Sequence, residues 1–130
     1  MRSKTEIEKI GKQIVDAAFE VHSELGPGLL ESVYEICLVD ELESRGLLVE
    51  RQVKLPVIYK GKELNKDFFI DILVEKEIVI ELKAVEILLP VHEVQTLTYM
   101  KLADMRLGYL INFNVPLIKQ GIKRKINGYF

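Results

Sequence analysis

Residues 68–83 read FFIDILVEKEIVIELK, and this stretch decides the fold. Phe68 to Val74 and Ile78 to Val85 are two apolar runs rich in Val and Ile, a composition that predicts two β-strands. The link Glu75-Lys76-Glu77 is short enough to join them as an antiparallel hairpin. Strands as apolar as these are usually buried on both faces.

Three charged residues interrupt these apolar strands: Asp71 in the first, and Glu81 and Lys83 in the second. Burying an unpaired charge is costly, so each of them needs a partner, a metal ion or an opening to solvent. Because side chains alternate along a strand, Glu81 and Lys83 point to one face while the alternate apolar residues point to the other.

A hairpin centred on Lys76 places Asp71 opposite Glu81, with Cβ atoms roughly 4.5–5.5 Å apart. Two carboxylates this close repel each other, and the pKa of one of them should rise unless a cation lies between them. Two carboxylates with Lys83 beside them are consistent with a Mg²⁺ or Mn²⁺ site, since hard divalent cations prefer oxygen ligands. The structural alternative is an ion cluster of the three residues, or an edge strand that is solvated on one face.

Upstream of the hairpin, apolar residues at helical spacing predict amphipathic helices over Thr5 to Leu25 and Leu30 to Arg45. Gly26-Pro27-Gly28 separates the two helices, because Pro cannot continue a helix and Gly tolerates left-handed geometry. The alternating stretch from Val49 to Tyr59 predicts a strand, followed by a turn at Lys60-Gly61-Lys62.

Downstream, Pro90 is expected to open a helix that runs to Ala103. Leu107 to Phe113 and Ile122 to Ile126 are expected to be the closing strands. The element order ααβββαββ indicates an α/β or α+β fold with one mixed sheet flanked by helices. A length of 130 residues suits one domain spanning residues 1–130.

The composition is that of an ordinary soluble globular protein, with 48% hydrophobic and 29% charged residues, which excludes disordered and fibrous classes. A net charge of −2 argues against a strongly cationic nucleic-acid wrapper. The single cysteine, Cys37, excludes an internal disulfide, and no apolar run is long enough to span a bilayer. We therefore expect a cytoplasmic protein that does not associate with membranes.

Three motifs resemble those of one nuclease superfamily. Asp71, nine further residues and then Glu81-Leu82-Lys83 resemble the D…(D/E)-x-K signature of the PD-(D/E)xK nucleases. Gln95 to Tyr99 resembles the Q-x-x-x-Y motif of RecB-like members, and Gly28 to Tyr34 matches the G-x-x-E-x-x-Y pattern that names a small family within the superfamily. The order of the motifs fits the α-βββ-α-β core of the restriction-endonuclease-like fold; one departure is that Ile70, not Pro, precedes Asp71.

The resemblance implies metal-dependent hydrolysis of phosphodiester bonds. Asp71 and Glu81 would be the central ligands of Mg²⁺ or Mn²⁺, and Lys83 would orient or help to deprotonate the attacking water, or neutralise charge in the transition state. Glu31 would reach the same metal site directly or through water. From position alone, Glu31 is instead an acid that complements the dipole of its helix.

The remaining candidates each have a structural alternative. Gln95 and Tyr99 lie four residues apart on one helix face, where they would hold a phosphate or Lys83, or would be a solvated Gln and a half-buried core Tyr. His22 at a helix margin is a candidate metal ligand or proton carrier, although such a histidine is more often structural. His92 is expected on the surface of the first turn of its helix, and Cys37 in the core.

The leading hypothesis is a nuclease acting on nucleic acid, with DNA favoured over RNA. The alternative is a catalytically silent module of the same fold that binds nucleic acid or a protein partner. A small-molecule enzyme on a Rossmann-type sheet lacks support, since no glycine-rich phosphate-binding loop occurs. Ile87 to Pro90 is a candidate contact for a homodimer. The cations available to phosphates are Arg51, Lys54, Lys60, Lys62, Lys119, Lys123, Arg124 and Lys125.

Overall fold

The computed structural model describes residues 2–64 and 66–130. Its helices are α1 (Lys4–Leu25), α2 (Glu31–Ser44) and α3 (Pro90–Leu102), with a short 3₁₀ helix η1 (Ile118–Gly121). Its strands are β1 (Val49–Leu55), β2 (Ile58–Tyr59), β3 (Lys62–Glu63), β4 (Phe68–Val74), β5 (Ile78–Lys83), β6 (Leu107–Asn112) and β7 (Ile122–Ile126).

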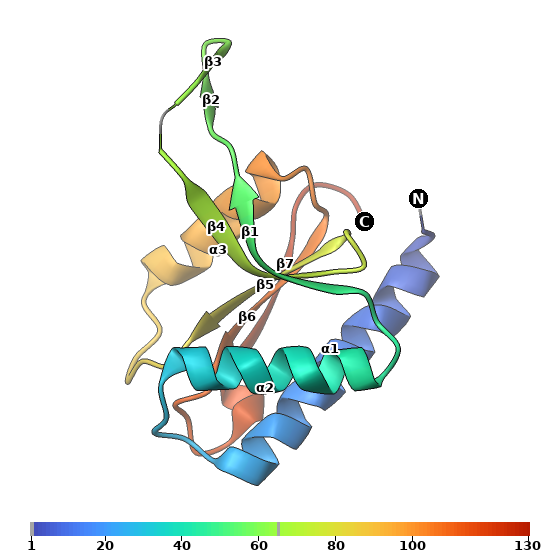
Figure 1. Ribbon diagram of the computed structural model, residues 1–130, viewed down its shortest axis with the longest axis vertical. Helices are drawn as coiled ribbons and strands as arrows, with labels where there is room; N and C mark the ends of the chain where they lie inside the picture. Colours follow the sequence, from blue (N-terminus) through green and yellow to red (C-terminus); the bar gives the residue numbers. More distant parts are fainter. Residues whose placement is uncertain (1, 65) are drawn as a thin grey trace.

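The main sheet has five strands in the order β1-β4-β5-β6-β7, and β2 pairs with β3 as a separate two-stranded piece. Strands β5 and β6 run parallel, joined through α3, whereas every other neighbouring pair in the main sheet is antiparallel. The two N-terminal helices lie on one side of the sheet and α3 lies on the other (Figure 1). This mixed sheet flanked by helices confirms the fold class predicted from the sequence, and β5 lies at its centre.

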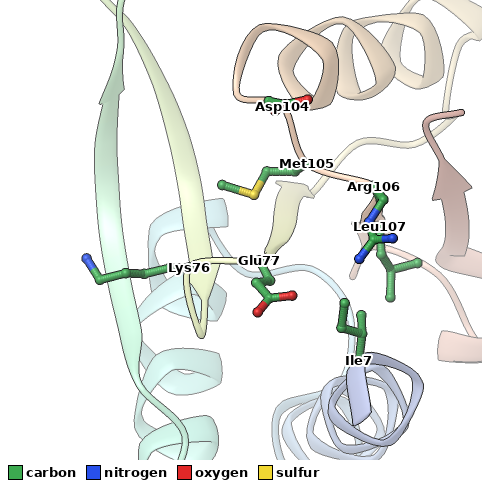
Figure 2. A pocket seen from close by; sticks show the side chains of 7 residues that line it. All are labelled: Ile7, Lys76, Glu77, Asp104, Met105, Arg106 and Leu107. Atoms are coloured by element: carbon green, nitrogen blue, oxygen red, sulfur yellow. The ribbon is translucent and has the colours of Figure 1, made fainter. Parts of the chain in front are cut away.

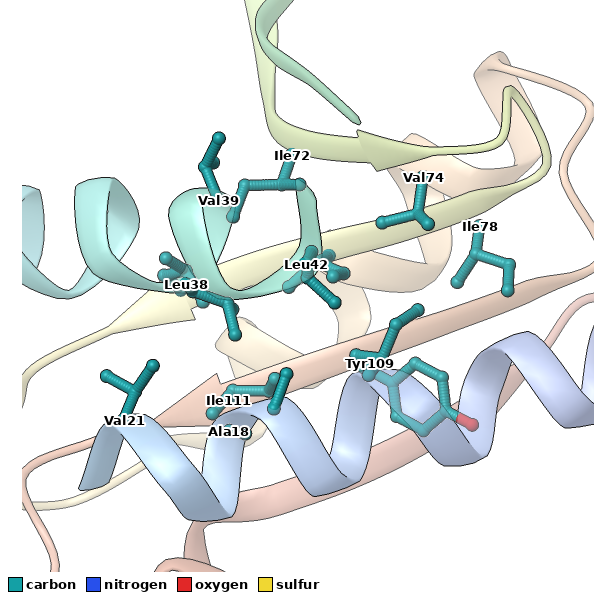
Figure 3. Close-up of a cluster of buried hydrophobic side chains, with 14 of the residues drawn as sticks. Ala18, Val21, Leu38, Val39, Leu42, Ile72, Val74, Ile78, Tyr109 and Ile111 are labelled. Carbon is teal, nitrogen blue, oxygen red and sulfur yellow. The ribbon is translucent and has the colours of Figure 1, made fainter. Parts of the chain in front are cut away.

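The larger core lies between the sheet and the helices α1 and α2 (Figure 3). Ile14 of α1 and Leu38 of α2 are fully buried there against Ile72, Ile80 and other sheet residues. Each such side chain contributes about 1.5–3 kcal/mol relative to exposure, so this layer supplies most of the hydrophobic stabilisation.

A smaller core lies on the opposite side of the sheet, beneath α3. Met100 of α3 is fully buried against Leu55, Ile70, Leu73 and Val79 of the first three strands of the main sheet. Because both faces of the central hairpin are covered, its nearly continuous apolar sequence is explained.

The corner between α1 and α2 is held by Tyr34. Gly26 and Gly28 adopt φ angles of 68° and 97°, which glycine tolerates without steric cost. The hydroxyl of Tyr34 donates to the carbonyl oxygen of Gly26 (2.6 Å) and accepts from the amide of Leu29 (3.1 Å). The Tyr34 ring stacks on Phe113 at 4.5 Å, so this corner is anchored to the end of β6.

Four details differ from the sequence prediction. The strand expected from Val49 to Tyr59 ends at Leu55, because Pro56 has no amide to donate to a ladder. The chain then forms the short hairpin of β2 and β3 around the expected turn, and β3 was not predicted. The strand from Ile78 ends at Lys83 rather than Val85, since the next residues turn toward α3. The helix η1 was also not predicted.

Across residues 2–64 and 66–130, no helix is both long and apolar enough to pass through a membrane.

Candidate active site

The ladder between β4 and β5 stops in the middle of the hairpin. Regular pairing runs from Val74–Ile78 to Ile72–Ile80, and the next rung would join Asp71 to Glu81. Strand β5 continues beyond this point along β6, where Glu81 faces Leu110 in a parallel ladder. The backbone on the β4 side of β5 is therefore free of strand pairing at the two carboxylates.

The two carboxylates take the place of the missing ladder. The amide of Asp71 donates to Oε1 of Glu81 (3.3 Å), and the amide of Leu82 donates to Oδ2 of Asp71 (2.8 Å). Each strand thus offers a carboxylate to the backbone of the other, and Asp71 lies beside Glu81 as the sequence predicts. Both side chains are held by the sheet itself, which fixes their separation.

Glu81 lies in an electrostatically unfavourable position when no cation is present. Its residue is 8% exposed. Burial, and next the neighbouring charge of Asp71, raise the pKa of Glu81 from its ordinary 4.5 to about 9. Lys83 partly opposes this rise in pKa. The site therefore holds a carboxyl group whose ionised form needs further positive charge.

On the side of β4 that faces β1, the carboxylate of Asp71 contacts the side chain of Gln52. Gln52 has a φ of 48°, unusual for a residue other than glycine, and it lies at the one rung that is skipped in the β1–β4 register. Its Nε2 donates to Oε1 of Glu35 (2.7 Å) and to Oδ1 of Asp71 (3.4 Å). Oε2 of Glu35 accepts from Arg51 Nη2 at 2.9 Å, so Glu35, only 7% exposed, is fully partnered.

The Gln52–Asp71 rung is also where β1 and β4 exchange faces. Before it, Arg51 reaches α2 and Ile72 packs in the core beneath α1 and α2. After it, Val53 and Ile70 both pack in the core beneath α3. Regular alternation would have put residues two positions apart on the same side. This local break in the sheet turns the Asp71 carboxylate out of both cores.

Glu31 stands on the first turn of α2, at the corner that Tyr34 anchors. Burial and the charge of Asp71 raise the pKa of Glu31, and Lys83 lowers it in part. The charges of Asp71 and Lys83 thus act on Glu31. Within the stretch from Gly28 to Tyr34, glycine forms the corner and the tyrosine hydroxyl locks it, with Glu31 on the helical turn between them.

Lys83 is half-buried at the end of β5, where the strand is fastened on its β6 side. The amide of Phe113 donates to the carbonyl oxygen of Lys83 (3.0 Å). Asn112, 2% exposed, then pairs with the backbone of Val85, accepting from its amide (3.1 Å) and donating to its carbonyl (2.9 Å). These bonds fix the backbone from which the ammonium group of Lys83 extends.

Gln95 and Tyr99 lie on the side of α3 that approaches the site. Nε2 of Gln95 donates to the Tyr99 hydroxyl at 3.1 Å, and Gln95 is exposed while Tyr99 is half-buried. Burial raises the pKa of Tyr99, and the charges of Glu81 and Asp71 raise it further. The charges of the carboxylates therefore act on Tyr99, to which Gln95 is hydrogen-bonded.

The two histidines and the cysteine have local partners. His22 donates from Nε2 to the carbonyl oxygen of Val115 (2.8 Å), so this nitrogen ties α1 to the segment after β6. His92 is half-buried in the first turn of α3, where its Nδ1 accepts from the amide of Leu89 (3.0 Å). Cys37 is partly buried and packs against the core of α1 and α2, close to its expected position.

The comparison with known protein families now decides the identity of the fold. The profile of the PD-(D/E)XK nuclease superfamily matches residues 8–125, nearly the whole chain. The chain belongs to the PD-(D/E)XK nuclease superfamily. No significant match was found among curated proteins or among solved structures.

Nucleases of this superfamily generally use divalent metal ions, and the donor set of the site suits such an ion. Asp71 and Glu81 offer two carboxylates on neighbouring strands, and a cation between them would remove the repulsion that raises the pKa of Glu81. Within residues 2–64 and 66–130, no group of three or more His, Cys, Asp or Glu side chains is gathered to hold a metal ion. The pair would therefore bind a metal together with backbone carbonyl oxygens, water or substrate oxygens.

Three residues at the PD-(D/E)XK site were not singled out in the sequence. Glu35 and Gln52 form the network behind Asp71, and Asn112 fastens the segment that follows Lys83. The signal for Glu35 was present, since it follows Glu31 by one helical turn and carries a charge on a buried face. Gln52 and Asn112 act through bonds to residues distant in sequence, which a motif does not reveal.

A pocket of about 250 Å³ lies at the opposite end of the β4–β5 hairpin (Figure 2). It lies between the hairpin turn, the connection from α3 to β6, and the N-terminal part of α1. The pocket is lined by Ile7, Lys76, Glu77, Asp104, Met105, Arg106 and Leu107. None of these is a residue of the nuclease motifs, so the hollow is separate from the candidate active site.

Proposed function

We propose that this protein is a metal-dependent nuclease that hydrolyses phosphodiester bonds of nucleic acid at the Asp71–Glu81 pair. The observation that supports it is the opened ladder, in which each carboxylate accepts a bond from the opposite strand beside Lys83. A structural ion cluster is a poor explanation, since Glu81 without a cation has a pKa near 9. Buried carboxylates held together without compensation reduce stability and are typical of functional sites.

We further propose that the protein is a RecB-like member of the G-x-x-E-x-x-Y type. This assignment is supported by the positions of both motifs, since Glu31 and Tyr99 each interact electrostatically with the carboxylate pair. Two helices from opposite sides of the sheet thus contribute to one site.

A divalent ion, Mg²⁺ or Mn²⁺, bound by Asp71 and Glu81 would polarise the phosphate and lower the pKa of the attacking water. The chain itself supplies the rest of the chemistry. Lys83 brings an ammonium group that neutralises phosphate charge and orients the water by hydrogen bonding. Glu31 accepts a hydrogen bond from water on the α2 side of the site.

The residues behind the carboxylates keep them in place. Gln52, fixed by Glu35, donates to Asp71, so that Asp71 keeps its Oδ2 on the amide of Leu82. Tyr99 and Gln95 present hydroxyl and amide groups on the α3 side, where they can donate to a phosphate oxygen.

The test is cleavage of labelled single-stranded DNA, double-stranded DNA, branched DNA and RNA in Mg²⁺ or Mn²⁺, with EDTA as the metal-free control. Lys83→Ala is expected to reduce the rate by about 10²–10⁴-fold, the usual effect of removing a group that acts on a proton or charge in the transition state. DNA is the expected substrate class, and RNA is the second class tested.

The matched control is Lys76→Ala, at the turn of the same hairpin, whose side chain is 69% exposed. Lys76→Ala should retain the wild-type rate, because this lysine lies away from the carboxylates. An equal loss of cleavage in both variants, or cleavage that survives in EDTA, would refute the proposal. Absence of cleavage on every substrate, with the protein fully folded, would also count against it.

A further inference from the structure

The two-stranded end of the β1–β4 pair projects beyond the rest of the molecule (Figure 1). We call residues 54–64 and 66–69 the outer ribbon; it contains β2, β3 and the ends of β1 and β4. Leu55 is the only buried residue described in the outer ribbon. A two-stranded ribbon is at best marginally stable in water on its own, so its exposed apolar surface calls for an explanation.

The outer ribbon presents large apolar and aromatic side chains to solvent. Tyr59 is 60% exposed, Ile58 64%, Phe69 43% and Phe68 38%. Interspersed with them are four lysines, at positions 54, 60, 62 and 66, against the two acids Glu63 and Asp67. Lys60 lies over the ring of Tyr59, with its Nζ 5.4 Å from the ring centroid. Aromatic rings and cations are thus combined on one projecting ribbon, with Phe68 on its α3 face and Phe69 on the opposite face.

The helices α1 and α2 have the opposite character. Residues 13–44 carry eight Asp and Glu and no Lys or Arg, in a chain whose net charge is only −2. The remaining residues therefore carry a formal charge of +6 in total. Of this the outer ribbon carries +2, from four lysines and two acids, so a polyanion approaching the carboxylate pair would be repelled from the acidic helical stretch and weakly attracted to the ribbon.

The aromatic surface is continuous with the candidate active site. Phe68 precedes Asp71 by three residues, and its ring meets the ring of Tyr99 edge-on at 6.2 Å. The charges of Glu81 and Asp71 act on Tyr99, adding to the rise in pKa that burial of its hydroxyl causes. An extended strand lying along the ribbon would therefore pass from Tyr59 over Phe68 and Tyr99 to the carboxylates.

We propose that the outer ribbon binds single-stranded nucleic acid, stacking bases on its aromatic side chains and pairing phosphates with its lysines, and leads the strand to the Asp71–Glu81 pair. Single strands expose the faces of their bases, whereas a duplex keeps them stacked inside, so only a single strand can use the rings. The role of guiding the strand to the site rests on the proposed nuclease function, whereas the binding does not.

The test is fluorescence anisotropy with a labelled 20-residue oligothymidylate, an oligouridylate of equal length and a 20-base-pair duplex, in EDTA so that no cleavage occurs. Tyr59→Ala and Phe68→Ala should each weaken binding of the single strands by about 5- to 100-fold. Binding of the duplex should change little. The oligouridylate arm shows whether the ribbon distinguishes RNA from DNA.

The matched control for stacking is Tyr129→Ala, because Tyr129 is 97% exposed and lies outside the ribbon. Its single-strand affinity should stay within about twofold of wild type. For the charges, Lys60→Ala with Lys62→Ala should reduce the slope of log K against log salt by about 1.4, since each phosphate contact on a single strand contributes about 0.7. The double variant at Lys9 and Lys12, both exposed on α1, should leave the slope unchanged.

The ribbon proposal falls if Tyr59→Ala and Phe68→Ala bind single strands as wild type does, or if wild type prefers the duplex. It also falls if sedimentation shows that these variants dissociate a homodimer without changing strand affinity, since the ribbon would then be a protein interface. Loss of binding in the ribbon variants, with no cleavage by wild type, would support the ribbon and refute the nuclease. Cleavage that is abolished only by Lys83→Ala, with ribbon variants that bind normally, would support the nuclease and refute the ribbon.

Discussion

The two ends of the β4–β5 hairpin are built from the same two strands but are held by different bonds. At the turn end, three rungs from Ile72–Ile80 to Val74–Ile78 form an ordinary ladder, and all six residues are buried. At the open end, Asp71 and Glu81 replace the ladder with side-chain bonds to the opposite backbone. One rung separates a stretch that stabilises the fold from the proposed metal site.

The difference shows how a small fold can maintain an acidic site. The buried rungs fix the register of the strands, and a shift by one residue would move every side chain to the other face. Asp71 and Glu81 therefore meet because the apolar residues beside them cannot pair in any other way. The unfavourable charges are concentrated where the β4–β5 ladder stops and side-chain bonds replace it.

The largest effect should come from breaking the turn end. Ile80→Ala removes a fully buried side chain from the core beneath α1 and α2 and should lower the free energy of unfolding by about 3–4 kcal/mol. Urea denaturation measures this change. Ile58→Ala, at a position 64% exposed, is the control and should change stability by less than about 0.5 kcal/mol. Equal effects at both positions would mean that the hairpin core does not carry the stability assigned to it.

At the open end, the charged side chain of Glu81 should lower the stability of the metal-free protein, whereas Ile80 at the turn end raises it. Because the pKa of Glu81 is raised to about 9 in the folded protein, the folded state keeps a proton that the unfolded state has released. Stability of the metal-free protein should therefore be fully present below the unfolded pKa, near 4.5, and should fall as the pH rises toward 9. The groups that act on Glu81 are Asp71 and Lys83, and Tyr99 lies within their field.

The variant Glu81→Gln isolates the contribution that ionisation of Glu81 makes to stability. The variant should be more stable than wild type at pH 8 without metal, by on the order of 2 kcal/mol, and the difference should vanish near pH 4. Thermal melts at several pH values in EDTA give the comparison. Adding Mg²⁺ or Mn²⁺ should stabilise wild type and not the variant. A wild-type protein whose stability follows that of Glu81→Gln at every pH would show that Glu81 ionises normally.

The hairpin was predictable from sequence because its information is local. Apolar runs and a three-residue link specify the strands, and the pairing of Ile72 with Ile80 then follows from the link length. The meeting of Asp71 with Glu81 follows from the same register. These positions needed no knowledge of distant parts of the chain.

The supports of the site were not predictable in the same way. Gln52 takes a positive φ at a rung where two strands exchange faces, and the sequence of β1 alternates without any glycine or proline to mark this rung. Asn112 acts on Val85, 27 residues earlier, through a parallel strand that only the fold brings alongside. His22 has a partner at Val115, which a helical wheel cannot show. Such contacts depend on tertiary structure rather than on local pattern.

The smallest effect should come from Gln52, which joins Glu35 of α2 to Asp71 at the open end. Gln52→Asn introduces a residue that tolerates positive φ and shortens the amide, so the backbone is not strained further while the bonds to Glu35 and Asp71 are lost. We expect a loss of about 1 kcal/mol in unfolding free energy and about tenfold weaker Mn²⁺ binding, because the carboxylate of Asp71 is no longer held. Urea denaturation and calorimetric Mn²⁺ titration measure the two quantities separately.

Gln120→Asn, at an exposed glutamine of η1, is the matched control and should change neither quantity. Gln52→Glu sharpens the test, because it has the length of glutamine but places a third carboxylate between Glu35 and Asp71. Its stability should fall further as the pH rises from 5 to 8, since like charges then accumulate. If Gln52→Asn loses stability but binds Mn²⁺ normally, Gln52 contributes to the stability of the fold and not to the metal site. If it loses Mn²⁺ affinity as well, the supporting network of the carboxylates begins at β1 and includes Glu35.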